Sequence, residues 1–171
     1  PSKLGISGVS DGSTTTQFAL VNRPGLFAAA SVAACCVEPT SMMAFGGLAL
    51  AQDRRSKGYP AFGPGDEAFW QPLSLARNAH RITTPLLLQL ADNEYLLGVE
   101  TFTALHDQGQ PVEMHIFPDE YHLKWQPAHR LSVYKRNLDW FDYWLLGRED
   151  ADPAKRAQYD RWGALRQSRQ P

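Results

Sequence analysis

The feature that most constrains the fold of this chain is the pentapeptide Gly8-Val9-Ser10-Asp11-Gly12 near its start. The residues before it, 3–7, have the pattern of a buried strand end, and residues 13–21 after it have that of a helix. A G-x-S-x-G motif between a strand and a helix places the serine on a sharp turn, where glycines allow close packing of a strained backbone. The motif predicts that Ser10 is a nucleophile, although a bare pentapeptide is common and Ser10 could be an ordinary helix-start residue.

A serine nucleophile needs a general base and a carboxylate that orients the base. The apolar run at residues 84–90 is typical of a buried parallel strand, and a polar turn that contains Asp92 and Glu94 follows it. Carboxylates at the carboxyl end of a parallel strand point into the ligand crevice, so Asp92 is the predicted acid. Glu94 is its rival, and Asp92 could also be no more than a cap of the next helix.

The predicted base is His122, which follows a helix pattern at residues 97–107 and an alternating strand at 112–117. The order serine, acid, histidine is that of α/β-hydrolases, whose base lies in a loop after a late strand. The other histidines are less well placed, in a loop, on a helix, within a strand and in the helix after the base: His80, His106, His115 and His129.

Further segments in the same order make the chain similar to a known family. They are Phe27-Ala28-Ala29-Ala30, Trp70-Gln71-Pro72-Leu73-Ser74, Thr84-Pro85-Leu86-Leu87-Leu88, and Phe117-Pro118 shortly before His122. With the serine motif they resemble the C-terminal part of the catalytic domain of prolyl oligopeptidase-type (S9) serine peptidases. Within that family the chain is most similar to the lasso peptide isopeptidases, through Cys35-Cys36-Val37-Glu38-Pro39, residues 122–130 and Asn137-Leu138-Asp139-Trp140-Phe141.

The resemblance implies an α/β-hydrolase fold, present as its C-terminal part: a parallel sheet with flanking helices but without the N-terminal strands. It implies an amide-cleaving serine hydrolase that acts on a peptide through an acyl-enzyme and uses no cofactor. The backbone N–H of Asp11 would be one oxyanion donor, and a second would come from a missing N-terminal segment. A β-propeller is also expected there. A chain without those strands would have an open sheet edge, so we expect it to fold poorly or to be inactive alone.

Two departures from the family pattern indicate a divergent pocket and a specialised substrate. Many members have a further glycine where this chain has Ser13, and many have His-Gly where it has Gln89-Leu90. The resemblance to the lasso peptide isopeptidases implies that the target is the isopeptide bond that closes a lasso peptide ring. Two alternatives stay open, a dipeptidyl or acylaminoacyl peptidase with the same triad and a non-catalytic remnant that binds a partner.

The region between residues 37 and 84 is rich in glycine, proline and aromatic residues and is expected to cover the pocket. Candidate wall residues are Glu38, Met42, Met43, Tyr59, Phe62, Trp70 and, after the base, Trp125. Each of them could equally pack locally.

The expected organisation is an α/β-hydrolase portion at residues 1–147 and a polar extension at 148–171 with a short helix near 154–165. A helix at residues 126–146 has an apolar stripe that is expected to pack in the core. The stripe consists of Leu131, Tyr134, Leu138, Phe141 and Leu145.

Composition excludes little beyond charge-driven partners. The 17 basic and 18 acidic residues are balanced, which predicts no attraction to nucleic acid or membrane surfaces. The longest apolar stretch, residues 26–37, is too short to span a bilayer. Cys35 and Cys36 are adjacent and are expected to be buried thiols, since disulfide geometry disfavours a bond between neighbours. No metal-ligand spacing is present, and the sequence does not indicate a compartment.

Overall fold

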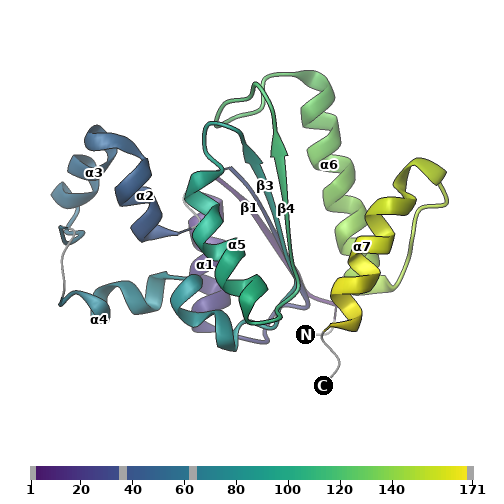
Figure 1. Ribbon diagram of the computed structural model, residues 1–171, viewed down its shortest axis with the longest axis horizontal. Coiled ribbons are helices and arrows are strands. Elements are labelled where there is room, and N and C mark those ends of the chain that lie inside the picture. Colours follow the sequence, from purple (N-terminus) through teal and green to yellow (C-terminus); the bar gives the residue numbers. More distant parts are fainter. Residues whose placement is uncertain (1–2, 35–37, 62–64, 169–171) are drawn as a thin grey trace.

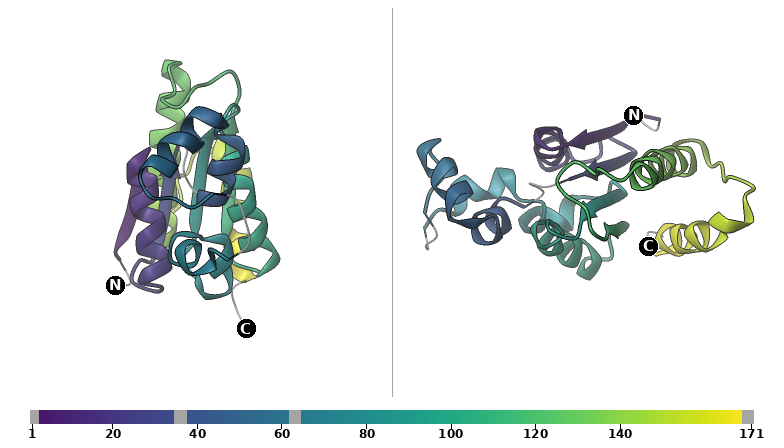
Figure 2. Two further views of the ribbon diagram at one scale, coloured as in Figure 1. Left: turned by 90° about the vertical axis from the view of Figure 1, so that its left-hand side faces the viewer. Right: turned by 90° about the horizontal axis from the view of Figure 1, so that it is seen from above.

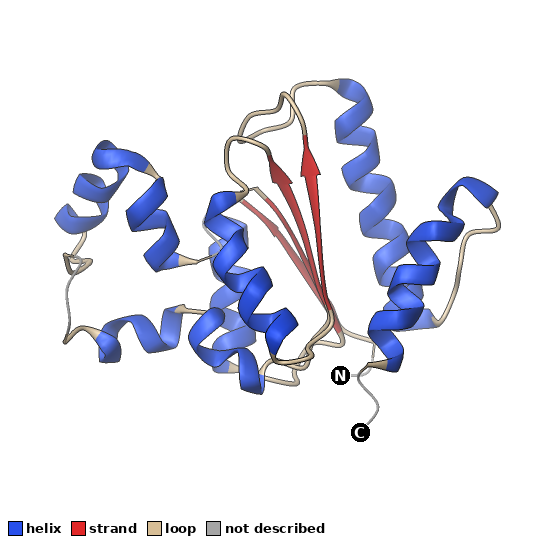
Figure 3. Ribbon diagram, viewed as in Figure 1, coloured by secondary structure: helices blue, strands red, loops and turns tan. Residues whose placement is uncertain are grey.

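A sheet of four parallel strands forms the centre of the molecule (Figure 3). The computed structural model describes residues 3–34, 38–61 and 65–168. The strands lie side by side in chain order, β1 (Gly5–Val9), β2 (Ala29–Ala33), β3 (Leu86–Ala91) and β4 (Val112–Phe117). All three neighbouring pairs are parallel, so the carboxyl ends of the strands meet at one edge of the sheet. The predicted α/β architecture is confirmed.

Helices cover both faces of the sheet (Figures 1 and 2). On one face lie α1 (Asp11–Asn22) and α5 (Leu96–Asp107), and on the other lies α6 (Pro127–Phe141). Alternating side chains of β3 serve the two faces, as the strand period of two requires. Leu88 packs in the core formed with α1 and α5, whereas Leu87 packs with Trp140 of α6.

The connection from β2 to β3 is a long helical excursion beside the sheet, at the left of Figure 1. It comprises α2 (Pro39–Phe45), α3 (Gly47–Ser56), α4 (Glu67–Trp70) and two 3₁₀ helices, Gln71–Leu73 and Ala76–Arg81. Its aromatic rings pack on one another, with the ring centroids of Tyr59 and Phe69 5.3 Å apart and those of Phe69 and Trp70 5.1 Å apart. This part of the chain therefore has a small core of its own.

The C-terminal segment packs back onto the sheet rather than extending from it. A π-helical turn (Asp142–Leu146) continues α6, and a 3₁₀ turn (Pro153–Lys155) leads into α7 (Arg156–Gln167). Trp162 of α7 is fully buried against Trp140, with ring centroids 5.0 Å apart in an edge-to-face arrangement. The segment expected to be a polar extension thus contributes two large aromatic side chains, Tyr159 and Trp162, to a core.

Three residues of the expected apolar stripe lie on the outer face of α6, so the prediction that they pack in the core is wrong. Leu131, Tyr134 and Leu138 are 53%, 64% and 68% exposed, because α6 turns Val133 and Trp140 toward the sheet instead. Phe141 and Leu145 do pack against the aromatic core around Trp140.

Strand β1 is an edge of the sheet, paired among the described residues with β2 alone. Val9, its last residue, is half exposed. This edge and the three exposed side chains of α6 are therefore apolar or hydrogen-bonding surfaces that the described residues leave uncovered. No helix in the described part of the chain is both long and apolar enough to cross a membrane.

Candidate active site

Ser10 lies in a strained turn between β1 and α1. Its φ of 56° and ψ of −122° are unusual for a residue with a Cβ atom, and such strain is often stored at functional sites. Gly8 makes the turn possible, because a Cβ at this position would lie 2.0 Å from the carbonyl oxygen of Gly12. The Ser13 hydroxyl donates to the Gly8 carbonyl at 3.2 Å. The turn therefore has the strand–turn–helix form that the G-x-S-x-G motif predicts.

His122 contacts Ser10 across the carboxyl ends of the strands. The distance from His122 Nε2 to Ser10 Oγ is 2.9 Å, although the two residues lie 112 positions apart in the chain. The loop after β4 carries His122, and the turn after β1 carries Ser10. The expected placement of the histidine next to the serine is what the structure has, and the histidine side chain remains 38% exposed.

The carboxylate that contacts His122 belongs to Glu94 and not to Asp92. Glu94 Oε1 lies 2.6 Å from His122 Nδ1, and the Glu94 side chain is 12% exposed. An ionised carboxylate can only accept, so Nδ1 carries the proton and Nε2 offers its lone pair to the serine hydroxyl. The prediction of Asp92 as the orienting acid is corrected in favour of its rival, because the turn after β3 brings the longer side chain two residues further on to the ring.

Asp92 holds the start of the histidine loop instead. Its Oδ2 accepts the backbone N–H of Asp119 at 2.7 Å, and its Oδ1 accepts that of Glu120 at 3.3 Å. The N–H donor of Asp119 above all, together with that of Glu120, lowers the pKa of Asp92. Asp119 itself has a positive φ of 52°. The carboxylate thus fixes a strained backbone turn that leads to His122.

The arrangement of Ser10, His122 and Glu94 suits nucleophilic attack on a carbonyl group. The imidazole can take the hydroxyl proton, while the carboxylate stabilises the imidazolium that forms. The backbone N–H of Asp11 opens α1, where the first N–H groups of a helix have no intrahelical partners. It is placed directly after the serine, as an oxyanion donor in this motif is.

A cavity of about 290 Å³ opens beside His122. Its walls are Val9 and Ala33 from the ends of β1 and β2, Leu123 from the histidine loop, and Val133 and Tyr134 from α6, with Arg130 also lining it. Mostly apolar side chains therefore surround the space next to the ring that contacts Ser10.

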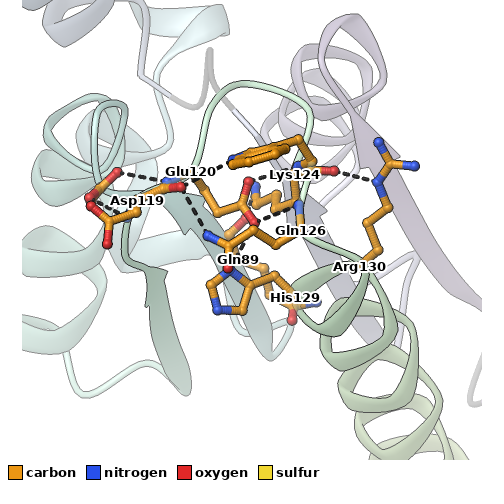
Figure 4. Close-up of polar contacts among 9 residues, drawn as sticks. Gln89, Asp119, Glu120, Lys124, Gln126, His129 and Arg130 are labelled. Atoms are coloured by element: carbon orange, nitrogen blue, oxygen red, sulfur yellow. Dashed lines mark hydrogen bonds and ion pairs between the residues drawn. The ribbon is translucent and has the colours of Figure 1, made fainter.

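Two buried charged residues of the histidine loop, Glu120 and Lys124, are not among the residues predicted from the sequence (Figure 4). Lys124 Nζ donates to the backbone carbonyl of Gln89 in β3 at 3.0 Å. Burial lowers the pKa of Lys124, against the opposing effect of the carboxylates of Glu94 and Glu120. Charged residues that alternate with exposed apolar ones in a loop were the available signal, since only the inward side chains can anchor it.

Of the expected wall residues, Glu38 is fully buried and cannot face a substrate. Its Oε2 accepts the backbone N–H of Ala76 and the hydroxyl of Thr101, each at 3.2 Å. Burial above all, together with the charge of the neighbouring Glu100, raises the pKa of Glu38 to about 7, although hydrogen bonds from Ser74, Ala76 and Thr101 lower it. The expectation for Glu38 is therefore corrected, and its carboxyl group joins the β2–α2 connection to the start of a 3₁₀ helix and to α5.

The other candidates divide by burial. Trp70, Met42 and Met43 are buried as well, which contradicts a place on an open wall, and Tyr59 is half-buried among aromatic rings. Phe62, Cys35 and Cys36 lie outside the described residues. Trp125 is 62% exposed, and its indole N–H points to the carbonyl of Asp119 at 3.4 Å. Trp125 thus keeps an apolar surface close to the histidine loop, where contact with a substrate stays a prediction.

The remaining histidines lie apart from this arrangement. His80 and His106 are exposed, and His115 is a mid-strand residue of β4 whose pKa falls to about 4 through burial and the nearby Arg136, Arg161 and His129. No group of three or more His, Cys, Asp or Glu side chains in the described ranges could hold a metal ion.

Comparison with known proteins gives this geometry a context. The model of the prolyl oligopeptidase family matches residues 1–148. The lasso peptide isopeptidase AtxE2 of Asticcacaulis excentricus is 45% identical over 170 residues, which are 99% of this chain and 24% of that protein. A solved structure of AtxE2 isopeptidase with Astexin3-dC4 bound superimposes with a TM-score of 0.90, over 99% of this chain and 26% of that one. The chain thus spans about a quarter of the length of these relatives.

More distant solved structures share the fold. A puromycin-hydrolysing peptidase of Mycobacterium tuberculosis is 22% identical, with a TM-score of 0.72 over 85% of this chain and 22% of its own. The acylaminoacyl peptidase of Pyrococcus horikoshii is also 22% identical, with a TM-score of 0.67 over 92% of this chain and 26% of its own. At this identity the likeness establishes the architecture alone.

Proposed function

The chain belongs to the prolyl oligopeptidase family, and we propose that it carries the catalytic triad of a serine hydrolase that opens the isopeptide bond of a lasso peptide. In this proposal Ser10 is the nucleophile, His122 the general base and Glu94 the residue that orients the base. The observation that carries it is the unbroken line of contacts from Glu94 through His122 to Ser10, at 2.6 and 2.9 Å.

The first half of the reaction forms an acyl-enzyme. Ser10 Oγ attacks the amide carbonyl carbon while His122 Nε2 takes the hydroxyl proton, and the electron pair of the carbonyl moves onto its oxygen. The backbone N–H of Asp11 donates to that oxyanion. His122 then gives its proton to the amine as the carbon–nitrogen bond breaks, so the amine leaves neutral.

The second half regenerates the enzyme. Water attacks the ester carbon, His122 takes a proton from the water, and the ester bond to Ser10 breaks with the proton returned to the serine. The net change in the substrate is the gain of one water. A ring that an isopeptide bond closes would open without any loss of residues.

We prefer a lasso peptide as substrate because the chain is much more similar in sequence to an isopeptidase than to the general peptidases. The chain is 45% identical to an isopeptidase across nearly its whole length but 22% identical to the two peptidases above. The departures at Ser13 and Gln89 from the common family pattern agree with a specialised pocket.

The chain covers 24% of the length of AtxE2. We propose that residues preceding it in the full-length protein provide the second oxyanion donor, further strands and a β-propeller. The open edge of β1 and the exposed side chains Leu131, Tyr134 and Leu138 of α6 offer surfaces for such a segment to cover. Without that cover, hydrophobic surface of this kind favours association or aggregation.

The test is a product assay with the full-length protein and its Ser10→Ala variant. Each is incubated with threaded lasso peptides and with linear dipeptidyl and acylaminoacyl substrates, and the products are identified by mass spectrometry. We expect a lasso peptide to gain one water with the wild type and to stay intact with Ser10→Ala. Release of dipeptides or acyl amino acids from the linear substrates, with lasso peptides untouched, would show a general peptidase instead.

A fluorophosphonate probe separates an enzyme from a non-catalytic remnant. This reagent reacts with an activated serine and does not depend on the substrate. Labelling of the wild type that disappears in Ser10→Ala supports the triad, and a folded protein that is not labelled would show that the site is inactive.

A further inference from the structure

The loop that carries His122 is closed around the carboxylate of Glu120. The loop runs from Pro118 to Gln126, between β4 and α6, and forms neither a helix nor a strand. Glu120 Oε2 accepts the backbone N–H of Trp125 at 2.7 Å, and Oε1 accepts that of Gln126 at 3.1 Å (Figure 4). His129 Nδ1 of α6 lies 2.8 Å from Oε1. A single side chain therefore joins both ends of the loop and the first turns of α6.

Because Glu120 is buried, its carboxylate depends on these hydrogen bonds. The side chain of Glu120 has no exposed surface, so water cannot solvate its charge. Burial by itself would raise the pKa of Glu120, but the N–H donors of Trp125, His129 and Gln126 outweigh it and keep the pKa below its usual value. The carboxylate is thus held as an anion by three donors that converge on it.

Two further side chains hold the loop to β3 and to the turn that follows it. Asp92 binds the backbone N–H groups of Asp119 and Glu120 at its start, and Lys124 binds the carbonyl of Gln89 from its second half. Exposed side chains alternate with these anchors, since Tyr121 and Leu123 are 66% and 63% exposed. His122 lies between the anchors Glu120 and Lys124, so the position of its ring follows from how tightly the loop is held.

We propose that Glu120 is a positioning residue for His122. Its carboxylate sets the loop conformation that keeps Nε2 within hydrogen-bond reach of Ser10 and Nδ1 against Glu94. Glu120 touches neither the serine nor the substrate and acts through the histidine alone. The inference rests on the proposed function, because it assigns a role in the same serine reaction.

The decisive variant is Glu120→Gln, which keeps the size of the side chain but replaces one acceptor oxygen with an NH₂ group. At least one of the three donors then loses its acceptor and the loop relaxes. A displacement of about 1 Å at a reacting group can cost about 100-fold in rate. We expect the maximal rate of fluorophosphonate labelling of the full-length protein to fall about 10- to 100-fold, with the half-saturating probe concentration unchanged.

A second background separates positioning from general damage. In the His122→Ala variant the labelling is already slow, and adding Glu120→Gln should slow it no further, because the histidine through which Glu120 acts is absent. A role in overall folding would slow both backgrounds equally. Glu67→Gln, an exposed glutamate of α4, is the matched control and should leave labelling unchanged.

The outcomes distinguish this inference from the proposed function. If Ser10→Ala and His122→Ala label as fast as the wild type, the triad itself is wrong. If Ser10→Ala does not label and His122→Ala labels slowly, but Glu120→Gln labels normally or costs the same in both backgrounds, the positioning role is refuted. Should Glu120→Gln not fold, His129→Ala removes one donor and should give a smaller loss of the same kind. An unchanged labelling rate in that variant would refute the proposal as well.

Discussion

Replacement of Glu38 by glutamine should change how the stability of the protein depends on pH. The carboxyl group of Glu38 is fully buried between the start of α2, Ala76 and Thr101, and burial raises its pKa from 4.5 to about 7. Between those two values the folded protein binds a proton that the unfolded chain has released. The stabilisation that this group contributes is therefore complete below pH 4.5 and is lost as the pH rises through about 7.

The size of the effect follows from the separation of the two pKa values. One pH unit corresponds to about 1.4 kcal/mol, so a separation of about 2.5 units gives about 3 kcal/mol over the whole range. Most of this falls between pH 5 and pH 8. The glutamine variant cannot ionise. The difference in free energy of unfolding between the variant and the wild type should therefore shift in favour of the variant by about 2–3 kcal/mol as the pH rises from 5 to 8.

The measurement is hydrogen exchange by mass spectrometry of peptides from α2 and α5, in the full-length protein at increasing urea concentrations. Taking the difference between Glu38→Gln and wild type at each pH cancels the other groups, including His115, whose lowered pKa acts in the opposite sense. Glu67→Gln is the matched control and should show no pH-dependent difference. A difference for Glu38→Gln that is the same at pH 5 and pH 8 would refute the reasoning, because Glu38 would then titrate at its ordinary value.

Three further predictions concern the site and the core. Glu94→Gln should slow fluorophosphonate labelling by about 10²- to 10⁴-fold and Asp92→Asn far less; the reverse order would restore Asp92 as the orienting acid. Gly8→Ala should abolish labelling, because the new Cβ would lie 2.0 Å from the Gly12 carbonyl oxygen. In the control Gly12→Ala the new Cβ meets nothing within 4 Å, so this variant should retain the fold and the labelling. Equal labelling of the two variants would contradict the close approach at Gly8. Trp162→Ala should lower the free energy of unfolding in urea by about 3–5 kcal/mol, since the indole is fully buried, and a loss below about 1 kcal/mol would show that α7 is not part of the core.

Much of the site could be predicted because its parts follow a fixed chain order. The serine motif lies between a strand and a helix, and His122 follows the last strand, so the two residues could be paired without a structure. The acid was harder, because the sequence places Asp92 and Glu94 in the same short turn. Position at the strand end favoured Asp92, but the direction of each side chain depends on the turn after β3, which no periodicity describes.

The helix in the C-terminal half shows a second limit of sequence patterns. Periodicity finds an apolar stripe on α6 at Leu131, Tyr134 and Leu138, but it does not say which apolar face turns to the sheet. The face with Val133 and Trp140 is the one that packs here. The segment that forms α7 is largely polar, but it contains Tyr159 and Trp162 three positions apart. This helical spacing was the available sign of a buried face.

The position of β1 at one edge of the sheet has a consequence for how the protein folds. Ser10 follows β1 and His122 follows β4, at opposite edges of the described sheet, and they are 112 residues apart in the chain. Contacts of such long range are costly in loop entropy and form slowly. Activation of the serine should therefore be a late event in folding, after all four strands have aligned. In a refolding experiment, a serine-directed probe would report completion of the whole sheet, well after helix formation has made the circular dichroism signal native-like.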